Sequence, residues 1–234
     1  MKRSHIDRII DQALSLCSAH GFHLPPWAHW TCDDWKQIGA EADEIRHHGL
    51  GWNATDFGGG DFEAQGLLLC VIRNGWLKDG KPATTKTYAE KAFIVGPGQV
   101  TPWHFHWMKT EDLLNRGGGR LEVEVAWADN DNEKSLSDKP VEVKVDSIAR
   151  TVKPGESLIL EPGQSIEFPP RMWHKFYGKS GDQKVIAGEV SSLNDDATDN
   201  CFLTPFATGK IEEDSPAKYP LLSEYFTLAK SSCC

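Results

Sequence analysis

Hydrophobic positions follow two different periods along the chain, and the change comes near residue 66. Close to the N-terminus, apolar residues recur at the spacing of one helical face: Ile6, Ile9, Ile10, Ala13, Leu14 and Cys17. Further on, apolar and polar residues alternate, as they do in a half-buried strand: Leu121, Val123 and Val125, then Val141, Val143 and Val145. The pattern predicts a helical N-terminal segment followed by a β-structure.

The N-terminal segment contains signals that end one helix and begin another. LPPW at 24–27 ends the first helix, and Thr31 is suited to cap a second short helix within TCDDWKQIG. Residues 49–60 are rich in glycine, so we expect an irregular loop there.

Short apolar runs separated by Gly and Pro fill the chain from residue 66 to about 191. They begin with GLLLCVIRNG (66–75) and include GRLEVEVAW, VEVKVDS and KVIAGEVSS. Many short strands joined by such turns are typical of a β-barrel or sandwich. We expect a mainly β fold, with residues 1–65 packed on the barrel as a helical and loop extension. Residues 66–234 would form the barrel and a C-terminal tail, within a single structural domain, because the first part has too small a core of its own.

The composition excludes two classes of binding partner and indicates the cellular compartment. The formal net charge of −9 over 234 residues argues against nucleic acid or an anionic membrane. No apolar run approaches a membrane span, and the first helix lacks the continuous apolar stretch of a signal peptide, so we expect a cytoplasmic protein. Its cysteines are expected to be free thiols, buried at Cys17, Cys32, Cys70 and Cys201 and on a loose tail at Cys233 and Cys234.

The segment PWHFHWMKTE carries the strongest chemical signal. On a strand, His104 and His106 point to one face and Phe105 to the other, while Glu111 follows after a bend. Two imidazoles and a carboxylate suit a divalent ion such as Mn, Fe, Ni or Zn. A fourth ligand should come from a neighbouring strand, for which His174 in PPRMWHKF is the candidate.

The spacing of these residues resembles the first cupin motif in full. Five residues separate Gly98 from His104, four separate His106 from Glu111, and six separate Glu111 from Gly118. A second motif, running from Gly163 to His174, is looser: Arg171 replaces its usual Gly, and Gly178 its usual Asn. The resemblance implies a cupin (double-stranded β-helix, or jelly-roll) barrel with His104, His106, Glu111 and His174 on one metal.

Longer blocks resemble the D-lyxose isomerase family. They are GLGWNATDFGGGDF, YAEK at 88–91, GQVTPWHFHWMKTEDLLNRGGG and GEVSSLNDDATDN. The resemblance implies a homodimeric, Mn²⁺-dependent cupin that interconverts D-lyxose and D-xylulose, and D-mannose and D-fructose.

Isomerisation requires an acid or base beside the metal. The resemblance favours Lys91 and Glu212 as the catalytic pair, and Glu189 is a further candidate on the last strand of the barrel. Lys109, between the histidine pair and Glu111, is a candidate for binding the substrate. Each of these charges could equally be a solvated surface group.

Two further residues are candidates for binding sugar. Asp199 could accept hydrogen bonds from sugar hydroxyls, although Asp in DDATDN (195–200) also suits a capped turn. Trp107 could form an aromatic wall, although barrel packing explains it equally well.

The metal ligands alone leave three functions open. The first is a metal-dependent aldose–ketose isomerase, working by an enediol or a hydride-shift route. The second is an Fe(II)-dependent cupin dioxygenase, and the third is a non-catalytic sugar-binding cupin.

Overall fold

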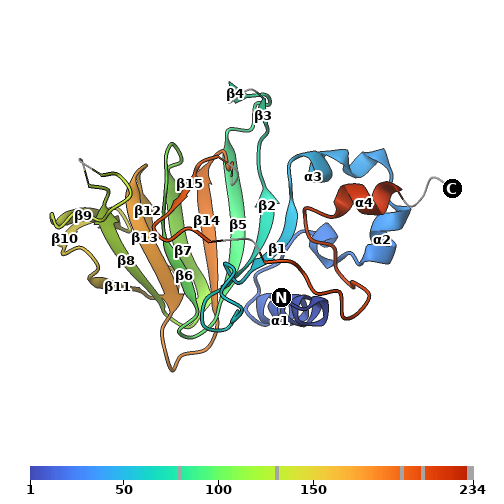
Figure 1. Cartoon of the computed structure of the whole chain (residues 1–234), viewed down its shortest axis with the longest axis horizontal. Helices are drawn as coiled ribbons and strands as arrows, with labels where there is room; N and C mark the ends of the chain where they lie inside the picture. Colours follow the sequence, from blue (N-terminus) through green and yellow to red (C-terminus); the bar gives the residue numbers. More distant parts are fainter. Residues whose placement is uncertain (79–80, 130–131, 196–197, 207–208, 231–234) are drawn as a thin grey trace.

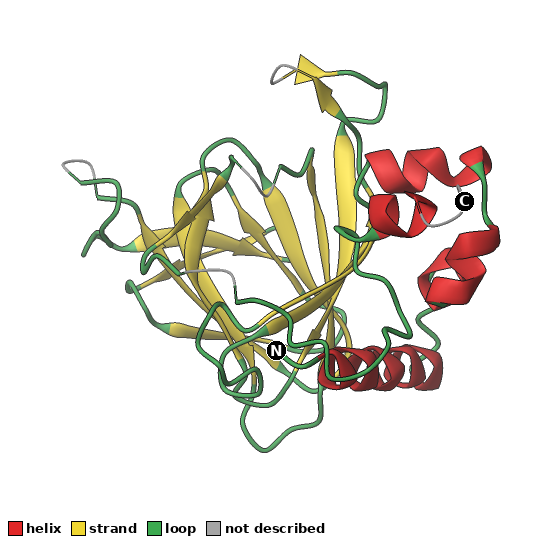
Figure 2. Ribbon diagram, turned by 45° about the vertical axis from the view of Figure 1, so that its right-hand side comes forward, coloured by secondary structure: helices red, strands yellow, loops and turns green. Residues whose placement is uncertain are grey.

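The computed structural model describes residues 1–78, 81–129, 132–195, 198–206 and 209–230. Its helices gather on one side of a set of strands, as Figures 1 and 2 show. The helical elements are α1 (Arg3–Ala19), η1 (Pro26–His29), α2 (Cys32–Gln37), η2 (Ala40–Ala42), α3 (Asp43–His47) and α4 (Tyr225–Lys230).

The strands form two larger antiparallel sheets and a small hairpin. The larger sheets have the orders β1-β2-β5-β14-β7-β12-β9-β10 and β11-β8-β13-β6-β15, and β3 pairs with β4. The strands are β1 (Gly51–Thr55), β2 (Leu67–Arg73), β3 (Leu77–Lys78), β4 (Lys81–Pro82), β5 (Tyr88–Val95), β6 (Val100–His106), β7 (Glu111–Gly118), β8 (Leu121–Trp127), β9 (Val141–Val145), β10 (Ile148–Val152), β11 (Ser157–Leu160), β12 (Ser165–Phe168), β13 (Met172–Gly178), β14 (Val185–Ser192) and β15 (Asn200–Phe202). The prediction of a mainly β fold is confirmed.

The space between the two larger sheets is filled by the alternating apolar residues of the strands. Val123 and Val125 of β8 are buried there together with Val143 of β9, while the residues between them face outward. Alternation of this kind is expected where one face of a sheet packs on a core and the other meets water.

By contrast, the strands next to the helices are apolar on both faces. In β2, five consecutive residues from Leu68 to Ile72 are buried. Leu69 and Val71 face the barrel interior, whereas Leu68 and Cys70 pack against the cluster that contains Ile6 and the other buried residues of α1. The continuous apolar run at 66–72 therefore reflects a sheet covered on its second face.

Residues 49–60 are more regular than the sequence indicated. Gly51–Thr55 forms β1, which pairs with β2 along its whole length, so the prediction of an irregular loop is wrong for this part. The chain needs a glycine here because a Cβ atom on Gly51 would lie 1.8 Å from the hydroxyl of Tyr225.

The prediction that Thr31 caps the second helix is confirmed: Thr31 and Asp34 form a capping box at α2.

The C-terminal segment returns to the N-terminal helices. Tyr225 of α4 packs on Trp35 of α2, with ring centroids 4.4 Å apart. Arg3 of α1 is only 2% exposed and pairs with two carboxylates of this segment. Its Nη2 donates to Glu213 Oε1 at 2.8 Å and also pairs with Glu224. These contacts fix the last part of the chain to the first.

Cys17, Cys70 and Cys201 are buried free thiols, as predicted, whereas Cys32 is only half-buried. Cys233 and Cys234 lie outside the described residues.

In the part of the chain that the structure describes, no helix has both the length and the apolar character needed to cross a membrane.

Replacing Arg3 tests the connection between the two ends of the chain. We expect Arg3→Met to lower the free energy of unfolding by about 2 kcal/mol, because charged hydrogen bonds to Glu213 and Glu224 are lost. Urea unfolding followed by circular dichroism measures the change. Lys2→Met is the matched control, because the exposed Lys2 lies 3.9 Å from Glu212, and its effect should stay within about 0.5 kcal/mol. Equal unfolding midpoints for the two variants would contradict this role of Arg3.

Candidate metal centre and adjoining cavity

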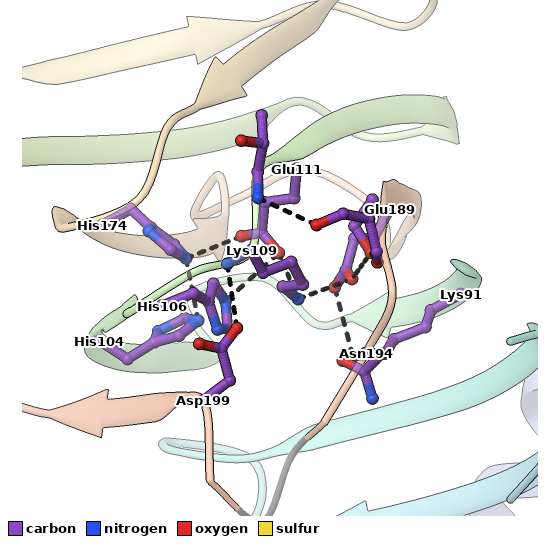
Figure 3. A network of polar contacts seen from close by, with 12 residues as sticks. Lys91, His104, His106, Lys109, Glu111, His174, Glu189, Asn194 and Asp199 are labelled. Carbon is purple, nitrogen blue, oxygen red and sulfur yellow. Dashed lines mark hydrogen bonds and ion pairs between the residues drawn. The ribbon is translucent and has the colours of Figure 1, made fainter. Parts of the chain in front are cut away.

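Four side chains from three strands converge inside the barrel. His104 and His106 lie on β6, Glu111 begins β7, and His174 on β13 pairs directly with His104. As expected from strand geometry, Phe105 points the other way and packs against Trp173. All four candidate ligands are buried (Figure 3), and one nitrogen or oxygen atom from each lies within 4.8 Å of the others.

The distances between the donor atoms fit a single bound ion. Nε2 of His174 lies 2.9 Å from Nε2 of His104 and 3.0 Å from Oε1 of Glu111. Nε2 of His106 lies 3.3 Å from Oε2 of Glu111. Adjacent ligands at about 2.1 Å from an ion are separated by about 3 Å, so the spacing suits a divalent metal.

The hydrogen bonds of two imidazoles favour the same interpretation. Nδ1 of His104 lies 2.8 Å from the carbonyl oxygen of Pro102, and Nδ1 of His174 lies 3.0 Å from that of Met172. A carbonyl only accepts, so each Nδ1 carries the proton and each Nε2 presents a lone pair. Two facing lone pairs cannot form a hydrogen bond, but both can bind one cation. The cluster could therefore hold a metal ion.

Electrostatics keeps His104 and Glu111 in the protonation states that bind a cation. Burial lowers the pKa of His104, and His174 and His106 lower it further, so the imidazole is neutral at pH 7. Burial alone would raise the pKa of Glu111, but the ammonium of Lys109 holds it well below its usual range. Glu111 is therefore ionised.

Lys109 connects the candidate metal centre to a second carboxylate. Its Nζ lies 2.6 Å from Oε2 of Glu111 and 2.8 Å from Oε1 of Glu189. Burial alone would lower its pKa, but the two carboxylates raise it, so Lys109 stays an ammonium ion. Glu189 also lies 3.5 Å from Nζ of Lys91, its register partner on β5. Positive and negative side chains therefore alternate in the barrel interior, in the order Lys91, Glu189, Lys109 and Glu111.

These residues line a cavity of about 260 Å³. One part is polar and holds Lys91, Lys109 and Glu189 beside the candidate metal ligands. Another part is aromatic and is lined by Phe57, Phe202 and Phe206. A cavity this small suits a compact ligand, since pockets for drug-sized molecules have roughly 300–1,000 Å³.

Asp199 binds backbone groups of the turn between β6 and β7. Its carboxylate accepts hydrogen bonds from the backbone N–H groups of Met108 (2.8 Å) and Lys109 (3.1 Å). The backbone carbonyl of Asp199 also accepts from the N–H of Trp107 at 3.0 Å. Asp199 therefore holds the turn that carries Lys109.

Two other sequence candidates lie away from the cavity. Trp107 does not line it, but packs beside Phe105 with ring centroids 4.6 Å apart and lies beneath the guanidinium of Arg171. Glu212 is 66% exposed and lies beside Lys2, so the structure does not bring it to the candidate metal centre.

The sequence does not single out the three phenylalanines that line the cavity, Phe57, Phe202 and Phe206. Asn194, which accepts a hydrogen bond from Nζ of Lys91 but does not line the cavity, is not singled out either. Phe57 lies in the DFGGGDF stretch and Asn194 in the NDDATDN stretch, which the sequence marks only as blocks of resemblance. The positions of these residues depend on long-range strand pairing.

The backbone explains a glycine of the first motif, and it shows the conformation of the residue that replaces glycine in the second. A Cβ atom on Gly118 would lie 2.2 Å from the carbonyl oxygen of Lys184. Arg171 adopts φ +66, a conformation that favours glycine and costs another residue roughly 1–2 kcal/mol. Its N–H still donates to the carbonyl of His106 at 2.9 Å, so the turn before His174 keeps its geometry.

Comparison with known proteins gives a consistent result. A family model described as D-lyxose isomerase matches residues 1–225. Proteins named D-lyxose/D-mannose isomerase from Escherichia coli O157:H7 and Serratia proteamaculans are 44% and 42% identical over 227 residues, which cover 96% of this chain and 98% of theirs.

Among solved structures, the L-ribose isomerase of Cellulomonas parahominis with L-ribose aligns with a TM-score of 0.59 at 19% identity. That of Geodermatophilus obscurus aligns with a TM-score of 0.60 at 17% identity. Both alignments cover 91% of this chain and 98% of the other. At such low sequence identity these alignments show a shared fold only. They confirm the prediction of a cupin fold.

Hydrogen exchange tests the role of Asp199. We expect Asp199→Ala to speed amide exchange at Met108 and Lys109 by roughly 5- to 30-fold, the equivalent of about 1–2 kcal/mol for hydrogen bonds lost there. Asp199→Asn should fall in between, because an amide has one acceptor oxygen where the carboxylate has two. Residue-resolved exchange by NMR measures the rates.

Asp214→Ala is the matched control. Asp214 accepts from the N–H of Ser4 at 3.0 Å, so its loss should speed exchange at Ser4 and leave Met108 and Lys109 unchanged. Unaltered rates at Met108 and Lys109 in Asp199→Ala would show that the turn is held by other contacts.

Proposed function

Because this chain belongs to the D-lyxose isomerase family, we propose that it interconverts D-lyxose and D-xylulose, and D-mannose and D-fructose, with Mn²⁺ as cofactor. That it is a sugar isomerase follows from the family; the particular sugars and the metal are the proposal. The observation that carries it is the position of Glu189. This carboxylate lines the same small cavity as His104, His106 and Glu111, and is linked to Glu111 through Lys109.

His104, His106, Glu111 and His174 would hold the ion. A bound divalent ion would polarise the C1 and C2 oxygens of the sugar and stabilise negative charge on them. Glu111 and the neutral imidazole of His104 already have the protonation states that such binding requires.

In the enediol route, Glu189 takes the proton from C2 and returns it to C1, while a second proton moves between the two oxygens. Oε1 of Glu189 accepts from Lys109 at 2.8 Å and from the hydroxyl of Ser191 at 2.9 Å, which fixes the carboxylate in one orientation. Lys109 remains protonated and cannot act as the base. Its charge would instead stabilise the enediolate.

Lys91 is the second proposed catalytic residue. Its ammonium lies beside Oε2 of Glu189 and donates to Asn194, at the border of the cavity. In this position Lys91 would donate a proton or a hydrogen bond to a sugar oxygen.

Family membership favours an isomerase over an Fe(II) dioxygenase or a non-catalytic binding protein, which the ligands alone left open. A homodimer and a cytoplasmic location are also proposed here. The homodimer rests on the family resemblance, and the location agrees with the free thiols at Cys17, Cys32, Cys70 and Cys201.

Metal removal tests the proposal. Protein stripped with a chelator should lose D-lyxose conversion, and added Mn²⁺ should restore it without oxygen. NMR in heavy water measures D-xylulose and the deuterium content of C1 and C2. Deuterium at these carbons supports proton transfer through Glu189, and its absence in a converted product supports a hydride shift. If the metal-loaded protein converts no pentose or hexose, the proposed substrates are wrong.

Two glutamate substitutions distinguish the candidate bases. We expect Glu189→Gln to lower kcat by about 10²- to 10⁴-fold with a smaller change in KM, because the amide keeps the shape but cannot accept the proton. Glu212→Gln should leave kcat unchanged, since Glu212 is 66% exposed beside Lys2. The NMR assay with D-lyxose measures both. A large loss in Glu212→Gln with normal Glu189→Gln would reverse the assignment.

A further inference from the structure

Two phenylalanine rings lie between a second cavity and the one that holds Glu189 and Glu111, called here the sugar pocket. The pocket has a volume of about 260 Å³ and the second cavity about 540 Å³. Phe57 and Phe206 line both of them. These two side chains therefore form a partition, with the candidate metal centre on one side only.

The partition is built on fixed local contacts. Phe57 adopts φ +49, which is unusual for an aromatic residue, and its N–H donates to the hydroxyl of Thr55 at 2.9 Å. The ring of Phe206 meets Phe57 edge-on, with centroids 5.1 Å apart, and meets Phe202 at 4.6 Å. Phe202 stacks on His104 at 5.3 Å. A continuous series of rings thus connects the partition to a candidate metal ligand.

The two sides of the partition differ in their chemistry. A sugar with C1 and C2 at the metal centre and its far end toward Phe57 and Phe206 meets rings that offer no strong hydrogen-bond partner, although Asn53, Thr55 and Asn200 also line the pocket. The second cavity, by contrast, is lined by polar groups at Gln65, Lys175 and Thr204 and by the indole of Trp103. Such groups suit a further sugar unit.

We propose that Phe57 and Phe206 set the upper length of the substrate. Free monosaccharides end at the two rings, and an aldose that carries a second sugar on its terminal hydroxyl is excluded, although the cavity beyond has the room and the polar groups to accept it. This inference rests on the proposed function, because it assumes that C1 and C2 lie at the metal centre.

Phe206 is the better residue to change, because its side chain is already 36% exposed and its loss should disturb the fold little. The experiment compares D-mannose with 6-O-glucosyl-D-mannose, which share the same reducing end, in Mn²⁺-loaded wild-type protein and Phe206→Ala. We expect the ratio of kcat/KM for the disaccharide to that for D-mannose to rise at least about tenfold in the variant, because the two cavities become one.

Phe206→Leu keeps apolar bulk and should return the ratio most of the way to the wild-type value. Phe226→Ala is the matched control: this phenylalanine of α4 is 49% exposed, contacts His47 and lines neither cavity. It should leave the ratio unchanged.

Two results would overturn the inference. One is an unchanged ratio in a folded Phe206→Ala that still converts D-mannose. The other is an equal rise for both sugars, which would mean that the ring controls entry and not length.

Failure of the proposed function would be recognised separately. In that case neither protein converts D-mannose or D-lyxose, and titration calorimetry with the disaccharide decides the role of the partition. Binding at least about tenfold tighter in Phe206→Ala supports the partition, and equal binding refutes it.

Discussion

The Nε2 atoms of His104 and His174 face each other with their lone pairs, an arrangement that becomes favourable when a cation lies among them. Much of the site is arranged around this constraint. Backbone carbonyls hold the two rings in the required tautomer, and Lys109 keeps Glu111 ionised. Glu189 then balances the charge of Lys109, so a carboxylate suited to proton transfer is buried beside the ligands without an excess of charge.

The helical layer makes this interior possible. It covers the outer face of β2, β5 and β14, whose inward residues include Lys91 and Glu189. A covered sheet can hold buried charges at a fixed register, since both faces of its strands are packed. The N-terminal helix is therefore part of what positions the proposed acid and base, although none of its residues lines the cavity.

Local patterns in the sequence predicted what depends on local geometry. The alternation of His104, Phe105 and His106 along one strand correctly assigned each side chain to its face. The pattern could not show that the carboxylate of Asp199 would accept from Lys109, or that Glu213 and not Glu212 would meet a buried Arg3. These contacts join residues far apart in the chain, and neighbouring acidic residues look alike until the chain is folded.

The order of synthesis gives the C-terminal segment a particular significance. All four candidate ligands leave the ribosome before Asp199, Phe202 and Phe206, and these precede Glu213 and Glu224, which are bound by the first helix. A nascent chain can thus assemble the ligands in a barrel that is still open on one side. Two rings of the aromatic wall, Phe202 and Phe206, are therefore added to the pocket after the ligands, whereas Phe57 is already present.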